Sequence, residues 1–175
     1  MPFTDPQTNL RQFGIRATDH VADFGAGSGA YSIPASRMAG EGKVYAIEVQ
    51  KDLLERIKSD ATKAHISNIE FIWGDIESSG GTKLKEGAVD SAIVSNVLFQ
   101  VPDRNGLVGE VKRILKPGGR VLLIDWKDSF GGMGPNSTQL VSKALAQSFF
   151  EQAGFQLEKE IDAGEHHYGI IFRKI

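Results

Sequence analysis

A run of alternating glycines follows a short apolar segment that contains an acid. Residues 21–24 read Val-Ala-Asp-Phe, and Gly25, Gly27 and Gly29 come directly after them. Glycine adopts positive φ without a steric penalty and lets a ligand approach the backbone closely. Asp23 would lie near the carboxyl end of a buried strand, where open α/β sheets bind their ligands. We therefore predict a strand that leads into a ligand-binding loop.

The spacing of these glycines differs from that of a dinucleotide-binding loop. Such loops carry G-x-G-x-x-G, whereas the third glycine here comes one residue earlier. A pyrophosphate also needs a free helix N-terminus. The spacing therefore disfavours a dinucleotide, while a glycine-rich turn that binds no ligand stays open as an alternative.

Polar residues also close the other strands that we predict. Glu48 ends the second strand, where a carboxylate can accept hydrogen bonds from the two hydroxyls of a ribose. Asp75 ends the third, where it could accept from an adenine amino group while the Ile76 N–H donates to the ring. Asn96 and Asp125 follow at the fourth and fifth. Each acid alone could be a helix cap, but together with the glycine loop they indicate a nucleoside ligand.

The elements that must position these residues alternate between strands and helices, which indicates a parallel sheet. Apolar runs predict strands at 21–24, 43–48, 69–73, 89–94, 120–126, 155–161 and 167–173. Helices are predicted within 2–12, with Asp5 as cap and Pro6 as first residue, and at 31–39, 51–64, 104–115 and 137–153. Residues 77–88 are predicted to form a loop. The short turn between the last two strands makes that pair antiparallel.

Composition excludes several classes of function. The 175 residues contain no cysteine, which excludes disulfides, thiolate metal sites and cysteine nucleophiles. A net charge of −2 gives no overall field for nucleic acid. The first twenty residues are charged and lack an apolar core, so we expect no signal peptide and no membrane span. We expect a cytoplasmic protein with one domain over residues 1–175, in which residues 1–18 form a short helical extension.

The chain resembles the class I S-adenosylmethionine-dependent methyltransferases over nearly its whole length. Within them it is similar to the ubiquinone/menaquinone-biosynthesis-type small-molecule branch, judged by residues 94–102 and 114–126. The segments that carry the resemblance are Asp23 to Gly29, Glu48, Gly-Asp-Ile at 74–76, Ser-Asn-Val-Leu at 95–98 and Leu-Lys-Pro-Gly-Gly at 115–119.

The resemblance implies a fold and a cofactor. The fold is α/β, a Rossmann-like doubly wound sheet of seven mostly parallel strands in the order 3-2-1-4-5-7-6, with only strand seven antiparallel. The cofactor is S-adenosyl-L-methionine, with the glycines beside its methionine part, Asp23 near its amino group, Glu48 on ribose, and Asp75 with Ile76 on adenine. The full set that we expect to bind it is Asp23, Gly25, Ala26, Gly27, Gly29, Glu48, Val49, Asp75, Ile76, Ser95 and Asn96.

The resemblance also implies an enzyme that transfers a methyl group to a small-molecule acceptor by in-line displacement. The alternatives are an RNA methyltransferase and a cofactor-binding protein without catalysis. The Asn/Asp-Pro-Pro-Tyr/Phe motif of many amino-methylating enzymes is absent after strand four. Positioning supplies much of such catalysis, so a base is needed only if the acceptor must lose a proton. His166 and His167 are the candidates for one, because their turn should reach the cofactor edge; we expect no metal site.

Overall fold

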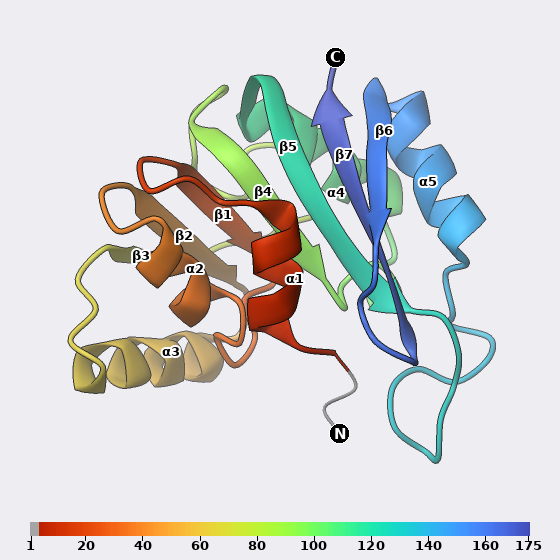
Figure 1. Cartoon of the computed structure of the whole chain (residues 1–175), viewed down its shortest axis with the longest axis horizontal. Coiled ribbons are helices and arrows are strands. Elements are labelled where there is room, and N and C mark those ends of the chain that lie inside the picture. Colours follow the sequence, from red (N-terminus) through yellow and green to blue (C-terminus); the bar gives the residue numbers. More distant parts are fainter. Residues whose placement is uncertain (1–3) are drawn as a thin grey trace.

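Seven strands form one sheet in the order β3-β2-β1-β4-β5-β7-β6, as predicted (Figure 1). The computed structural model describes residues 4–175. The strands are β1 (His20–Phe24), β2 (Lys43–Glu48), β3 (Ile69–Trp73), β4 (Val89–Ser95), β5 (Leu115–Trp126), β6 (Phe155–Ile161) and β7 (His167–Lys174). Strands β1 to β5 pair in parallel, whereas β7 runs antiparallel to both β5 and β6. Strand β6 therefore runs parallel to β5, and the β6–β7 turn lies at the carboxyl edge.

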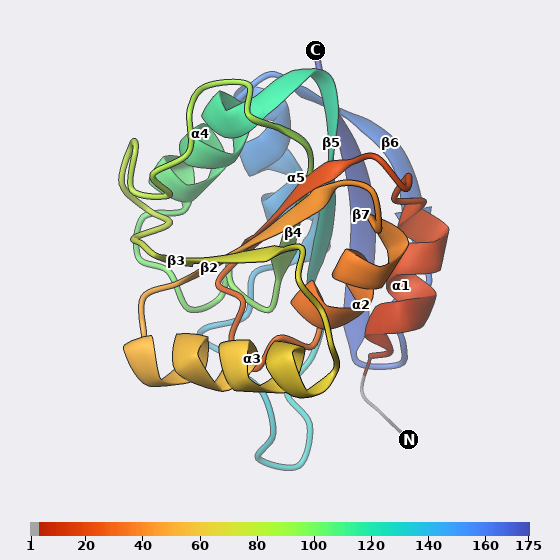
Figure 2. The same cartoon turned by 90° about the vertical axis from the view of Figure 1, so that its left-hand side faces the viewer.

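Helices cover both faces of the sheet (Figure 2). One face carries α1 (Pro6–Phe13), α2 (Ser32–Met38) and α3 (Lys51–Lys63), and the other carries α4 (Arg104–Ile114) and α5 (Lys143–Gln152). The apolar core is divided in the same way, with Phe13 buried under the first group and Phe150 under the second. Among the described residues, no helix has the length and apolar character needed to cross a bilayer.

The first helix forms where the sequence predicts it. Asp5 accepts a hydrogen bond from the Gln7 N–H at 3.1 Å, and Pro6 occupies the first helical position. Gly14 ends the helix with a φ of +79°. Residues 2 and 3 of the predicted segment lie outside the described residues.

Strand β5 begins earlier than predicted. The sequence predicts a helix through Leu115 and a strand from Arg120, because Lys-Pro-Gly-Gly separates them. Instead α4 ends at Ile114, and Leu115 is buried and pairs with Val89 of β4. The register shifts between this pair and the next, which joins Ser91 to Arg120. Burial of one leucine therefore extends the strand across a segment whose residues locally favour a turn.

Helix α5 begins at Lys143, later than the predicted start at residue 137, and Asn136 just before that predicted start does not cap it. The Asn136 Oδ1 accepts hydrogen bonds from the Thr138 and Gln139 N–H groups, so it closes a turn instead. The helix is capped by Ser142, whose hydroxyl oxygen accepts from the Leu145 N–H at 3.1 Å. Several residues in this region can cap a helix, and the local sequence does not distinguish among them.

Residues 77–88 form no helix, as predicted, and a buried carboxylate holds them. Glu110 of α4 accepts hydrogen bonds from the Gly80 N–H at 2.9 Å and from the N–H and hydroxyl of Thr82. Arg113 donates to the same carboxylate and to the Leu84 carbonyl. Burial by itself would raise the pKa of Glu110, but the hydrogen bonds from Arg113 and Thr82 lower it to about 2. This network ties the crossover to α4.

Candidate ligand-binding site

A cavity of about 510 Å³ opens at the carboxyl edge of the sheet. It lies between the loop after β1, the ends of β2 and β3, and the segment after β4. This is the location at which open α/β sheets bind their ligands. Its walls are formed by Gly25, Gly27, Glu48, Val49, Gln50, Leu53, Gly74, Asp75, Ile76, Glu77, Val97, Gln100 and Val101.

The three glycines of the loop have positive φ values, as predicted, but they differ in what they do. A side chain on Gly25 would come within 2.9 Å of Val97 on the wall of the cavity. Gly27, with φ +56°, lines the cavity, and a Cβ there would lie 3.8 Å from the Gly25 carbonyl oxygen. A Cβ on Gly29 would approach Ile57 of α3 at 3.0 Å. Gly29 therefore serves helix packing, whereas Gly25 and Gly27 shape the cavity.

Glu48 joins the glycine loop to the end of β2. Its Oε2 accepts from the Gly27 N–H at 2.9 Å, and its Oε1 accepts from the N–H groups of Val49 and Gln50 at 2.9 and 3.0 Å. The residue is 5% exposed and lies on the wall of the cavity. A carboxylate has about four acceptor positions, so hydrogen-bonding capacity remains for a ligand.

Asp75 and Ile76 line the cavity beside Glu48. The Asp75 carboxylate accepts from the Ser78 hydroxyl at 2.7 Å and from the Glu77 N–H at 2.9 Å. These hydrogen bonds lower the pKa of Asp75 below its ordinary value. The acid is therefore ionised near neutral pH and fixes the turn that leaves β3.

Asp23 lies beneath the loop and not on the cavity wall. It is 3% exposed, and its Oδ2 accepts from the Ser32 hydroxyl of α2 at 2.6 Å. Burial raises the pKa of Asp23 to about 6; the Ser32 hydrogen bond opposes this rise, and the charge of Glu48 adds to it. The site therefore holds an acid that a nearby positive charge would stabilise in its ionised form.

Three further predicted residues also lie away from the cavity wall. Ala26 is buried, and its N–H donates to the Ile47 carbonyl at 3.0 Å. Ser95 is the last residue of β4. Asn96 leaves the strand with a φ of +56°, and its N–H donates to the Ile124 carbonyl at 2.8 Å. These residues shape the backbone under the cavity.

The two histidines lie at the carboxyl edge, near the end of β5, as the topology predicts. The Lys127 N–H, just after β5, donates to the His166 carbonyl at 2.9 Å. The His166 Nδ1 lies 2.8 Å from the Asp128 Oδ1, and the Phe130 ring stacks on the imidazole at 4.2 Å. His167 is 2% exposed and packs against Trp126. The His166 imidazole is thus joined to a carboxylate at this edge of the sheet.

Sequence reasoning missed the apolar and amide wall of the cavity. Val97, Gln100 and Val101 follow β4. Gln50 precedes α3, and Leu53 lies in its first turn. In the sequence, Leu53 has the spacing of a core residue. Nothing in the local sequence marks Gln50 and Gln100 as residues of a cavity, because only the packing of two separate segments brings them together. In the described residues, no group of acids and histidines has the arrangement of a metal site.

The sheet order, the glycine loop after β1 and the acid at the end of β2 together define a Rossmann-like α/β protein of the methyltransferase class. The chain belongs to the methyltransferase domain family, which matches residues 15–168. A demethylmenaquinone methyltransferase of Lactococcus lactis is 27% identical over 94% of this chain and 68% of its own length. A ubiquinone/menaquinone biosynthesis C-methyltransferase of Francisella tularensis is 30% identical over 67% of this chain, but that match spans only 46% of the relative.

The architecture is shared with solved structures. A SAM-dependent methyltransferase of Aquifex aeolicus is 26% identical, with a TM-score of 0.89 over 99% of this chain and 91% of that one. The high TM-score agrees with the sheet order and the arrangement of helices described above.

Proposed function

We propose that this protein is an S-adenosylmethionine-dependent methyltransferase that acts on a small-molecule acceptor. The observation that carries the proposal is the cavity in which Gly27, Glu48 and Asp75 meet from the ends of three strands. Membership of the methyltransferase domain family supports it. We also propose that residues 1–175 act as one cytoplasmic domain, with residues 1–18 as its helical extension.

The residues on the cavity wall suit the parts of this cofactor. Glu48 would accept from a ribose hydroxyl, because its carboxylate keeps about one acceptor position beyond the three backbone bonds. Asp75 and Ile76 would border the adenine, and Val97 and Val101 would give it an apolar surface. Gly25 and Gly27 would admit the methionine portion, since side chains there would narrow the cavity.

Asp23 would act on the cofactor through charge. The buried carboxylate has its pKa raised to about 6. A cofactor that carries an ammonium and a sulfonium would stabilise the ionised acid. Ser32 holds the carboxylate in place, so Asp23 would orient the amino-acid portion from beneath the loop.

Bound S-adenosylmethionine supplies an electrophilic methyl group on a sulfonium. The protein's own task is then to hold the acceptor nucleophile in line with that methyl group and to exclude water. For an acceptor that must lose a proton, we propose His166 as the base. Asp128 would accept a hydrogen bond from the Nδ1–H of His166, which favours the tautomer whose Nε2 is the basic nitrogen.

The names of the relatives suggest the class of acceptor. One is named a demethylmenaquinone methyltransferase, and another a ubiquinone/menaquinone biosynthesis C-methyltransferase. We therefore propose a hydroxylated aromatic acceptor of the quinol type, whose nucleophilicity rises when a hydroxyl loses its proton. A net charge of −2 gives less support to an RNA acceptor.

The direct test is calorimetry with S-adenosylmethionine and S-adenosylhomocysteine, followed by a methyl-transfer assay with a reduced naphthoquinone. We expect binding of both cofactor forms and a methylated product. Absence of binding would overturn the proposal. Binding without transfer to quinols, phenols or RNA would identify a cofactor-binding protein, and transfer to RNA together with a salt-sensitive gel shift would identify an RNA methyltransferase.

A further inference from the structure

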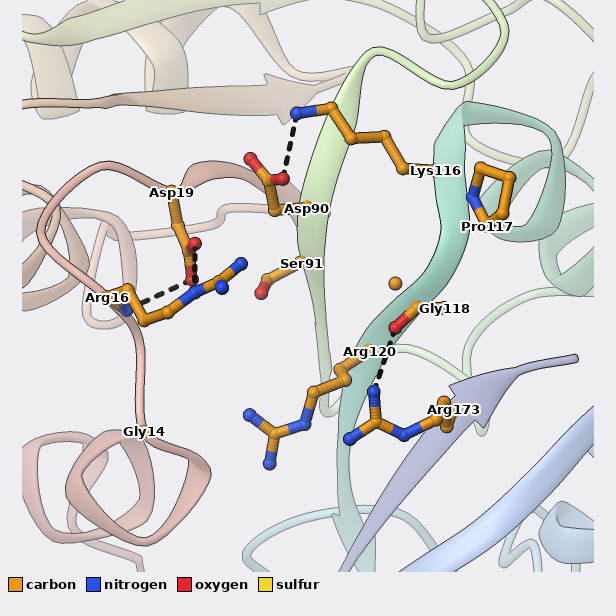
Figure 3. Close-up of a pocket in the computed structure, with 11 residues that line it drawn as sticks. Gly14, Arg16, Asp19, Asp90, Ser91, Lys116, Pro117, Gly118, Arg120 and Arg173 are labelled. Atoms are coloured by element: carbon orange, nitrogen blue, oxygen red, sulfur yellow. Dashed lines mark hydrogen bonds and ion pairs between the residues drawn. The ribbon is translucent and has the colours of Figure 1, made fainter.

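We propose that a second cavity, at the amino edge of the sheet, binds a small phosphate or phosphomonoester. The cavity has a volume of about 300 Å³ (Figure 3). Its walls come from the loop before β1, the start of β4, the Lys-Pro-Gly-Gly segment of β5 and the end of β7. The lining residues that matter here are Arg16, Ser91, Lys116, Arg120 and Arg173. This cavity lies at the edge opposite the ligand-binding cavity described above.

Ser91 supplies a buried polar group that points into the cavity. The residue is 4% exposed, and Figure 3 shows its hydroxyl directed into the open space beside β4. Within residues 4–175, that hydroxyl has no hydrogen-bond partner. The Ser91 hydroxyl is therefore available to donate a hydrogen bond to a molecule in the cavity.

Two guanidinium groups enter the same space. The Arg16 Nε pairs with the Asp19 Oδ1 at 2.9 Å, and the rest of its guanidinium extends into the cavity. Arg120 enters from β5 and is held from behind by Glu158, through Nε at 3.1 Å and Nη2 at 2.8 Å. Its guanidinium also lies over the Phe13 ring, 4.9 Å from the ring centroid. These contacts fix Arg120 firmly, while Arg16 keeps the outer part of its guanidinium directed at a ligand.

The balance of charge around the cavity is positive. Four cationic side chains line it, and the lining acids are Asp19 and Asp90, which gives a formal +2. Glu158 does not line the cavity, but it pairs with two of the lining cations, Arg120 at 2.8 Å and Arg173 at 2.9 Å. Counting its charge lowers the formal total to +1. Lys116 is paired with Asp90 at 2.8 Å, so the charge of Asp90 offsets its own.

The ligand class follows from this set of donors. Guanidinium groups present several N–H donors in a fixed plane, which suits the oxygens of a phosphate. The Ser91 hydroxyl adds a neutral donor between them. A phosphate would therefore bridge the loop before β1 to β4 and β5, and it would stabilise the folded state by binding to it alone.

Inorganic phosphate is the probe, used with the full chain. Calorimetry and thermal unfolding are compared in phosphate and in chloride at equal ionic strength. We expect saturable binding and a rise in Tm in phosphate only. Ser91→Ala and Arg16→Gln should each weaken phosphate binding by about tenfold. Arg56→Gln, at an exposed position on α3, is the matched control and should bind phosphate as the unmodified protein does.

Two outcomes would overturn the proposal. One is a phosphate effect that does not saturate. The other is equal phosphate binding by Ser91→Ala, Arg16→Gln and the control, which would mean an adventitious ion only. A glucose-phosphate titration beside the phosphate titration distinguishes a phosphomonoester site from one for the free ion. S-adenosylhomocysteine binding by the same variants should be unchanged, so the outcome does not depend on the proposed methyltransferase function.

Discussion

At the scale of single residues, Glu48 combines a structural and a ligand-binding task. Its carboxylate accepts three backbone hydrogen bonds and also lies on the wall of the cavity. A substitution there therefore acts on both the loop and the ligand. The two effects have to be measured separately.

We expect Glu48→Ala to weaken S-adenosylhomocysteine binding by about 1–3 kcal/mol, because a charge-assisted hydrogen bond to the ribose is lost. Calorimetry measures the affinity. Glu55→Ala, on the exposed side of α3, is the control for removal of a nearby acid. If Glu48→Ala keeps a native circular dichroism spectrum and full affinity, then Glu48 only holds the loop.

The buried acid Asp23 makes stability depend on pH. Its pKa is near 3.8 when unfolded and about 6 when folded, so the folded state binds more protons between these values. Stability therefore falls as pH rises from about 4 to about 6 and then levels off. Asp23→Asn should remove this contribution to the pH dependence of stability. Asp125, whose pKa is also raised to about 6 by burial, should still make its own contribution in the variant.

Urea unfolding at several pH values measures the Asp23 effect. Between pH 4 and pH 8 we expect the stability of Asp23→Asn relative to the unmodified protein to rise by about 2–3 kcal/mol. The same variant should bind S-adenosylhomocysteine more weakly, since it lacks the charge that faces the ammonium. Parallel pH profiles for the two proteins would show that Asp23 titrates normally.

The His166 and Asp128 pair makes a prediction about kinetics. Asp128→Asn should lower kcat with a quinol acceptor and change the pH profile, because the imidazole loses the carboxylate that fixes its tautomer. Cofactor affinity should stay unchanged. His166→Gln should lower kcat at least as much, and His166→Gln with unchanged kcat would exclude His166 as the base.

At the scale of elements, the crossover between β3 and β4 depends on one buried carboxylate of α4. We expect Glu110→Ala to lower the free energy of unfolding by about 3–5 kcal/mol, because Arg113 and two backbone N–H groups lose their partner. Urea unfolding measures it, with Glu151→Ala, at an exposed position of α5, as control.

The same carboxylate predicts sensitivity to acid. The pKa of Glu110 is about 2 when folded and near 4.5 when unfolded. The contribution of ionised Glu110 to the free energy of unfolding is therefore fully present above about pH 4.5, and it is lost as the pH falls toward 2. Acid unfolding of Glu110→Gln should be less steep over this range, and an unchanged slope would show that other carboxylates control it.

The elements also show where local signals are reliable. The bounds of β2 and β3 agree with the prediction, because each is an apolar run that ends at a polar strand terminus. The start of α5 does not agree, because Asn136 and Ser142 are both good caps and only Ser142 serves α5. Leu115 joins β5 because Val89 pairs with it across the sheet.

At the scale of the whole molecule, the two edges of the sheet are distinct surfaces. The carboxyl edge holds the cavity with Glu48 and Asp75, and the amino edge holds the cavity with Arg16 and Ser91. In the sequence, glycines and acids at strand ends predict the cavity at the carboxyl edge. The second cavity gave no motif, because its residues come from four separate segments.

The sequence by itself determined the alternation of strands and helices, the glycine loop and the acids at successive strand ends. Those features are local, and parallel strands bring their carboxyl ends together whatever the details of packing. Only the tertiary structure decided which predicted residues line the cavity. Asp23 and Gly29 are turned toward α2 and α3, whereas Val97 and Gln100 reach the cavity from the segment after β4. The direction of a side chain depends on its packing partners, which lie far away in the sequence.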